Sequence, residues 1–170
     1  MMRYINHILW FLGLIILQVF ILNNTHFLGM FLPIVYIYAL LRWPPDISPT
    51  LAILFGFLLG LSVDVLSDTP GMNASATTLI AFLRYPTLRL FVSKEELGSR
   101  VIGESTLANG AFWKYTVLLV LIHHATLFIL EDFSFSNSVL LLLKIPVCTL
   151  LTLIFIFAFE RINVKKDARD

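Results

Sequence analysis

Long apolar runs separated by short polar or proline-containing breaks dominate the pattern of this chain. A helix that crosses a bilayer core about 30 Å thick needs roughly 20 apolar residues. By that measure the pattern predicts six membrane-spanning helices, at residues 4–22, 27–43, 50–66, 72–91, 112–130 and 136–159. Proline-containing turns such as Trp43-Pro44-Pro45 and Asp68-Thr69-Pro70-Gly71 end the helices between them. The pattern therefore predicts an all-α integral membrane protein, with residues 1–170 forming one polytopic domain.

Two of these spans carry features that interrupt a regular helix. The second contains Pro33, and the fourth has its last clean apolar residue at Leu83, before Arg84, Pro86 and Arg89. For the fourth span we expect either a locally thin bilayer or an Arg84 side chain that reaches out to the headgroups.

The composition agrees with a membrane location. Of the 170 residues 58% are hydrophobic and 14% are charged, whereas soluble domains are about 25% charged. The net charge of +1 is too small to indicate a nucleic-acid partner. A single cysteine, Cys148, excludes an intrachain disulfide and a cysteine-based zinc site.

The distribution of basic residues predicts the orientation. With six spans, one side of the membrane holds eleven of the twelve Lys and Arg residues, at positions 3, 42, 84, 89, 94, 100, 114, 161, 165, 166 and 169. Basic residues favour the cytoplasmic side, so we expect both termini in the cytoplasm and residues 93–110 as a cytoplasmic loop. That loop is either a short helix on the membrane surface or a solvated segment.

Asp64 is the first candidate site residue, because ionisable groups inside spans are costly. Gly56, Gly60 and Asp64 are spaced by four and share one helical face, where small residues let another helix approach closely. Gly71 lies in the polar turn that follows. Asp64 is interpreted either as part of a partner-binding surface or as a group that bonds to the backbone of this turn and shapes it.

Lys144 is the one basic residue outside the predicted cytoplasmic segments. Lys144, Cys148 and Thr152 form a polar stripe with a spacing of four, which indicates a face turned into the bundle. Either Lys144 reaches out to the headgroups or it pairs with Asp64, which lies at a similar depth; this pair is a hypothesis.

The remaining polar groups indicate no chemistry. His123 and His124 are adjacent and point about 100° apart, so we expect hydrogen bonds between helices and no metal site. We find no His-Glu-x-x-His, no Gly-x-Ser-x-Gly and no phosphate-binding glycine loop. No catalytic residue, metal or cofactor is predicted, and the chain is not expected to be an enzyme.

The segment from Phe55 to Asp64, followed by Gly71 and the alanine-containing run 74–83, resembles the signature of the MreD family of rod-shape-determining proteins of bacteria. In that family a Gly-Leu-x-x-Asp segment ends one helix and a glycine-containing polar turn opens the next. Gly60, Leu61, Asp64 and Gly71 occupy those positions here. Leu32-Pro33 and the run 34–41 also resemble the second span of the family, and the size and topology agree over the whole chain.

The resemblance implies a non-enzymatic scaffold of the lateral cell-wall elongation machinery in the bacterial inner membrane. The implied direct partner is MreC, with MreB, RodA and a class B penicillin-binding protein in the wider complex. The implied fold is a six-helix bundle similar to the substrate-binding subunits of energy-coupling-factor transporters.

Two other functions are considered. A vitamin-binding subunit of such a transporter would need an outward-facing pocket of some 300 Å³ or more, for which Asp64, Asp68, Asn73 and Lys144 are candidate lining residues. The other is a small ion-coupled carrier that uses Asp64. Such carriers usually have paired broken spans, which the sequence of this chain lacks.

Overall fold

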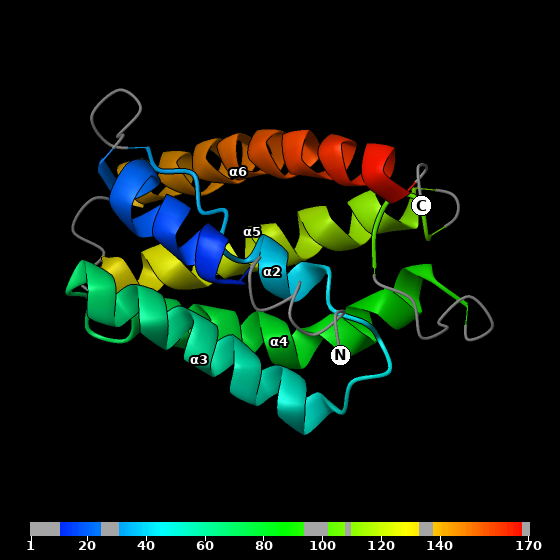
Figure 1. Cartoon of the computed structure of the whole chain (residues 1–170). Helices are drawn as coiled ribbons and strands as arrows, with labels where there is room; N and C mark the ends of the chain where they lie inside the picture. The colour runs from blue at the N-terminus through cyan, green and yellow to red at the C-terminus, as the bar shows by residue number, and fades with distance from the viewer. Residues whose placement is uncertain (1–10, 25–30, 94–101, 108–109, 133–137, 168–170) are drawn as a thin grey trace.

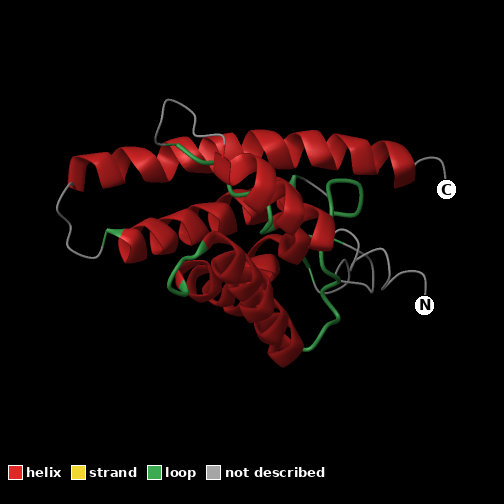
Figure 2. Ribbon diagram, turned by 60° about the vertical axis from the view of Figure 1, so that its left-hand side comes forward, coloured by secondary structure: helices red, strands yellow, loops and turns green. Residues whose placement is uncertain are grey.

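Helices are the main secondary structure in the part that the computed structural model describes, which is residues 11–24, 31–93, 102–107, 110–132 and 138–167. The start of the first predicted span and most of loop 93–110 lie outside these ranges. The described helices are the segment Phe11–Asn24, α2 (Tyr38–Leu41), α3 (Pro49–Ser67), α4 (Met72–Phe91), α5 (Ala111–Glu131) and α6 (Ser138–Asp167) (Figures 1 and 2).

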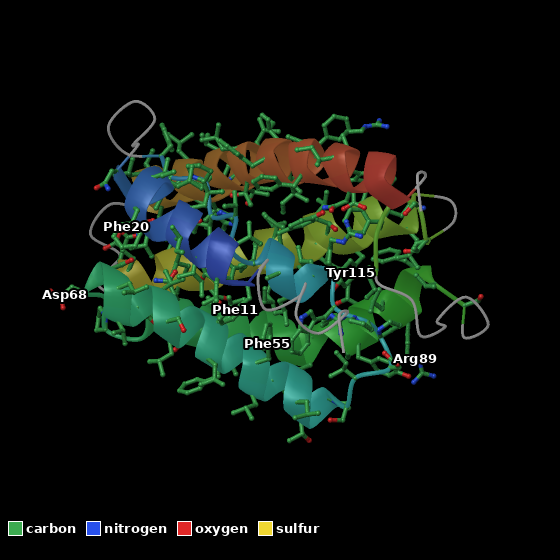
Figure 3. The ribbon with its side chains drawn as sticks, in the orientation of Figure 1. Phe11, Phe20, Phe55, Asp68, Arg89 and Tyr115 are labelled. Carbon is green, nitrogen blue, oxygen red and sulfur yellow. The ribbon has the colours of Figure 1, made fainter. Side chains whose placement is uncertain are left out.

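The four long helices alternate in direction. Figure 1 shows α3 running to one end of the bundle, α4 returning, α5 running back and α6 returning again toward the C-terminus. In Figure 3 the labels of Asp68 and Arg89 mark these opposite ends. We call them the turn end, which holds the α3–α4 turn at Asp68, and the basic end, which holds Arg89.

Local turn chemistry sets the helix boundaries. The Ser48 side chain accepts a hydrogen bond from Leu51 N (3.3 Å), and Pro49 takes the first position of α3. Asp68 (φ 53°) ends α3, and Gly71 (φ 84°) precedes α4 in a left-handed conformation that favours glycine. Predicted spans 50–66, 72–91 and 112–130 therefore agree with α3, α4 and α5 to within one residue at each end.

The surface of the described bundle has the character of a multi-pass membrane protein. Three helical stretches are long and apolar enough to cross a membrane: Pro49–Ser67, Ala111–Glu131 and Val139–Asn163. Large apolar side chains are exposed along all four long helices, whereas Asp64, Arg84, His123, His124 and Glu160 are each at most 2% exposed. Soluble domains show the opposite arrangement.

The prediction of one continuous helix over residues 27–43 is wrong for the part of this range that the structure describes. Residues 32–35 have no regular secondary structure, and only Tyr38–Leu41 is α-helical in this part of the chain. Pro33 has no N–H to donate, and side chains from other helices satisfy the unwound backbone. Gln18 Oε1 accepts a hydrogen bond from Val35 N (2.8 Å), and Gln18 Nε2 donates one to Pro33 O (3.1 Å). Irregular backbone at membrane depth is tolerated where it is buried in protein in this way.

The fourth predicted span is a full helix, α4, and the Arg84 side chain is turned into the protein. Its side chain is buried and donates to the carbonyl oxygens of Trp43 and Pro44, after α2. The basic group inside this span is therefore held by backbone carbonyls of the neighbouring turn.

Candidate functional site

Asp64 fixes the turn between α3 and α4. Its Oδ1 accepts from Thr69 Oγ1 (2.5 Å) and from both the backbone N (3.1 Å) and Nδ2 (3.0 Å) of Asn73. Its Oδ2 accepts from Ala74 N (2.8 Å). A carboxylate at this place satisfies unpaired N–H groups of the first turn of α4 and faces the positive end of its dipole. These contacts are the ones expected of a group that bonds to the backbone of the turn and shapes it.

The glycine face lies against α4 inside the same chain. A Cβ on Gly56 would lie 2.7 Å from Ala81 Cβ, and one on Gly60 would lie 2.6 Å from Ala74 Cα. Small-residue packing of this kind brings two helix backbones together. Since α4 already covers the Gly56–Gly60–Asp64 face, this face packs within the bundle and is not free for the span of a partner.

Lys144 pairs with a different carboxylate from the one hypothesised. Its Nζ lies 3.3 Å from Glu131 Oε1 at the end of α5, and 5.6 Å from the centroid of the Phe128 ring. The groups that donate hydrogen bonds to Asp64 belong to the α3–α4 turn and the start of α4. The hypothesis that Asp64 pairs with Lys144 is therefore wrong. The stripe that begins at Lys144 does face the interior, because Cys148 and Thr152 are both fully buried.

The Tyr36 hydroxyl joins the unwound segment to α4 and α5. It donates to Asn73 Oδ1 (3.0 Å) and lies 3.1 Å from both Thr77 Oγ1 and His123 Nε2. The Thr77 hydroxyl donates to Asn73 O (2.7 Å). Both hydroxyl protons are then committed, so His123 Nε2 must carry the proton and donate to Tyr36. The arrangement assigns neutral His123 the Nε2–H tautomer.

His124 takes the opposite tautomer. Its Nδ1 lies 2.8 Å from the carbonyl oxygen of Val120, which can only accept, so Nδ1 carries the proton. Its Nε2 then accepts from the Thr152 hydroxyl (3.2 Å), and that hydroxyl accepts from Ile34 N (2.8 Å). The histidine pair thus forms hydrogen bonds between helices, as expected. No group of three His, Cys, Asp or Glu side chains suited to a metal occurs in the described residues.

A partly open cavity of about 190 Å³ lies at the turn end, beside this network. Gln18, Asn23, Tyr36, Asn73 and Glu131 supply most of its polar lining. Much of this wall is bonded to itself: Gln18 Nε2 donates to Asn23 Oδ1 (2.9 Å), and Asn23 Nδ2 donates to Ser67 Oγ (2.8 Å). The volume is below the range of roughly 300–1,000 Å³ typical of small-molecule sites.

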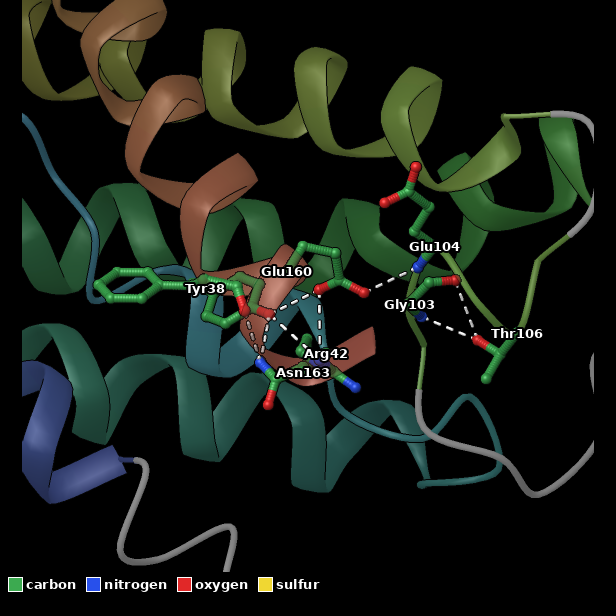
Figure 4. Close-up of polar contacts among 8 residues, drawn as sticks. Tyr38, Arg42, Gly103, Glu104, Thr106, Glu160 and Asn163 are labelled. Atoms are coloured by element: carbon green, nitrogen blue, oxygen red, sulfur yellow. Dashed lines mark hydrogen bonds and ion pairs between the residues drawn. The ribbon is translucent and has the colours of Figure 1, made fainter. Parts of the chain in front are cut away.

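A second polar cluster holds the basic end together, and Figure 4 shows it around Glu160 of α6. Glu160 is fully buried, and its Oε2 accepts from Tyr38 Oη (2.6 Å) and lies 3.2 Å from Arg42 Nη1. Its Oε1 accepts from Glu104 N (2.8 Å), while Ile102 N donates to Arg42 O (3.2 Å). The described part of the predicted loop, residues 102–107, is therefore anchored to the bundle.

Several residues of both clusters were not singled out from the sequence. Gln18 and Glu160 are the clearest cases, and a signal existed for each: Gln18 is a lone amide in an apolar run, and Glu160 directly follows one. Nothing in the sequence singles out Tyr36, because tyrosine is a common residue in apolar helical runs.

The contacts around these groups are those of a fixed structure. Asp64 and Glu160 each accept several hydrogen bonds from groups of the same chain. No protein-family model, no curated protein and no solved structure matches the chain.

Proposed function

We propose that this chain is a non-enzymatic scaffold of the bacterial inner membrane, of the MreD type, that works in lateral cell-wall elongation. MreC is the proposed direct partner, and MreB, RodA and a class B penicillin-binding protein belong to the wider complex. In this proposal the complete chain forms a six-span bundle similar to the substrate-binding subunits of energy-coupling-factor transporters, with both termini in the cytoplasm.

The observation that carries the proposal is that the described bundle is closed on itself. Its buried carboxylates are bonded within the chain, and the cavity at the turn end holds about 190 Å³. An internally bonded bundle with an apolar exterior suits a protein whose task is to hold the spans of other proteins.

The residues of the resemblance also act together. Gly60 allows α4 to approach, Asp64 caps α4, and Gly71 provides the left-handed residue before it. The motif that resembles the MreD family is therefore one structural device that closes the α3–α4 hairpin. Since the device is internal, the proposed partner surface lies elsewhere on the exterior.

The test is capture of the tagged protein from crosslinked native membranes, with partners identified by mass spectrometry. Recovery of MreC-like, RodA-like and transpeptidase proteins is the expected result. The variant Gly60→Leu, which cannot close the hairpin, should lose them, and Gly13→Ala, where a Cβ meets nothing within 4 Å, should keep them.

The alternative is the vitamin-binding subunit, favoured only by the polar lining of the cavity. Recovery of two ATPases with a coupling membrane subunit in the same capture would establish this alternative and refute the scaffold. Recovery of neither set would also contradict the proposal.

A further inference from the structure

Two exposed basic side chains project from neighbouring helices at the basic end. Lys114 lies in the first turn of α5, and Arg161 lies on α6. Two aromatic rings join the helices at this level, because the centroids of Trp113 and Phe157 lie 5.6 Å apart. The Arg161 guanidinium lies 4.8 Å from the Phe157 centroid, a cation–π arrangement.

An apolar surface extends from each basic residue toward the middle of the bundle. Val117 and Leu121 follow Lys114 at three and seven residues, on the same face of α5, and are 43% and 40% exposed. On α6 the residues before Arg161 at the matching spacing are Phe157, Ile154 and Leu150, which are 45%, 56% and 60% exposed. Each helix thus presents a cationic group at one end of an exposed apolar stripe.

Neither basic residue of this surface forms an ion pair within the described part of the chain. The ion pairs among the described residues are Arg42–Glu160 and Lys144–Glu131, and neither includes Lys114 or Arg161. Glu160, next to Arg161 in sequence, is buried and turned to Arg42 and Tyr38. Two other described carboxylates, Glu131 and Asp132, end α5 at its other end.

We propose that the α5–α6 surface at the basic end is a binding site for an anionic phospholipid. The phosphate lies between Lys114 and Arg161, the glycerol region lies against Trp113 and Phe157, and an acyl chain follows the apolar stripes. The occupant is assigned by complementarity: a lipid has an anionic head and an apolar tail in the same order as the surface. Basic pockets between spans recognise anionic headgroups in this way, and aromatic rings favour the headgroup level.

Trp113 allows a local test in purified protein. The chain has three tryptophans, so the background Trp10→Phe with Trp43→Phe leaves Trp113 as the one tryptophan, whose emission is excited selectively at wavelengths where tyrosine does not absorb. This protein is reconstituted in bilayers of phosphatidylcholine and phosphatidylglycerol, with either lipid brominated on its acyl chains. Quenching of Trp113 then reports which lipid occupies the surface.

The expected result is stronger quenching by brominated phosphatidylglycerol, with a preference of about fivefold for each basic residue near the headgroups. Lys114→Gln with Arg161→Gln should reduce the preference to about one, and added salt should weaken it. Arg89→Gln is the matched control, because it also removes an exposed cation beside an aromatic ring, with Arg89 5.6 Å from the Tyr85 centroid, but on α4. It should keep most of the preference.

Equal quenching by the two lipids in the unaltered protein would overturn the proposal. So would a preference that survives loss of both Lys114 and Arg161, or one that Arg89→Gln abolishes equally. If there is no lipid preference, but the double variant loses a crosslinked protein that Arg89→Gln retains, the surface is a protein interface and the lipid assignment is wrong. This test does not depend on the scaffold proposal.

Discussion

Gly60→Ala adds one methyl group at the closest approach of α3 and α4. The new Cβ would lie 2.6 Å from Ala74 Cα, whereas ordinary contacts of this kind are 3.4–4 Å. The neighbour is backbone and cannot rotate away, so the helices must separate by about 1 Å. Overpacking of this size costs about 1–3 kcal/mol.

The separation also stretches the bonds that cross the hairpin. Asp64 holds Ala74 N at 2.8 Å and Asn73 N at 3.1 Å, and at about 3.6 Å or more neither remains a hydrogen bond. Bonds to a charged group contribute about 1.5–3 kcal/mol each. We therefore expect Gly60→Ala to lower the free energy of unfolding by at least about 3 kcal/mol.

The assay is reversible unfolding of the purified protein in mixed micelles with increasing dodecyl sulfate, followed by circular dichroism. Gly13→Ala is the control, since its Cβ meets nothing within 4 Å in a helical segment; it should be neutral or stabilising. Gly56→Ala meets Ala81 Cβ at 2.7 Å, so adding Ala81→Gly should recover part of its loss. If Gly60→Ala unfolds like Gly13→Ala, the close approach is not required and the reasoning fails.

Three further changes test the polar contacts, with the same unfolding assay unless stated. Asp64→Asn replaces a carboxylate that accepts from four donors with an amide, whose NH₂ group must face some of those donors. The free energy of unfolding should fall by about 2–3 kcal/mol, and a change near zero would contradict the role of Asp64 as the cap of α4. Gln18→Leu leaves two buried backbone groups unpaired and should cost about 2–5 kcal/mol; unchanged amide exchange in the unwound segment would count against it. Glu160→Ala removes a fully buried carboxylate that accepts from Tyr38 and Glu104 and lies beside Arg42, with an expected loss of about 3–5 kcal/mol. Amide exchange of residues 102–107 should rise with it, and unchanged exchange there would show that Glu160 does not anchor the segment.

The ends of α3, α4 and α5 and the apolar character of a membrane protein follow from the sequence, because both depend on local or cumulative properties. Apolar content over a span length determines partition into a bilayer, and Ser48, Pro49 and Gly71 set helix ends through their own backbone chemistry. For the same reason, the spacing of Gly56, Gly60 and Asp64 was enough to place them on one helical face.

The partner of each buried group depends on the tertiary structure. The spacing of the glycines indicates close packing but does not say which helix approaches, and α4 takes that place. The depth of Lys144 suits either Asp64 or Glu131, and only the neighbouring position of α5 decides for Glu131. Such choices depend on positions in three dimensions, which the linear pattern does not contain.

The second predicted span shows the same division most clearly. The sequence determined that residues 27–43 are apolar and that Pro33 weakens a helix there. Whether the backbone unwinds depended on Gln18 and Thr152, which come from distant parts of the chain and bond to Pro33, Ile34 and Val35. An unwound backbone is stable at membrane depth only when such groups reach it, and tertiary packing alone brings them there.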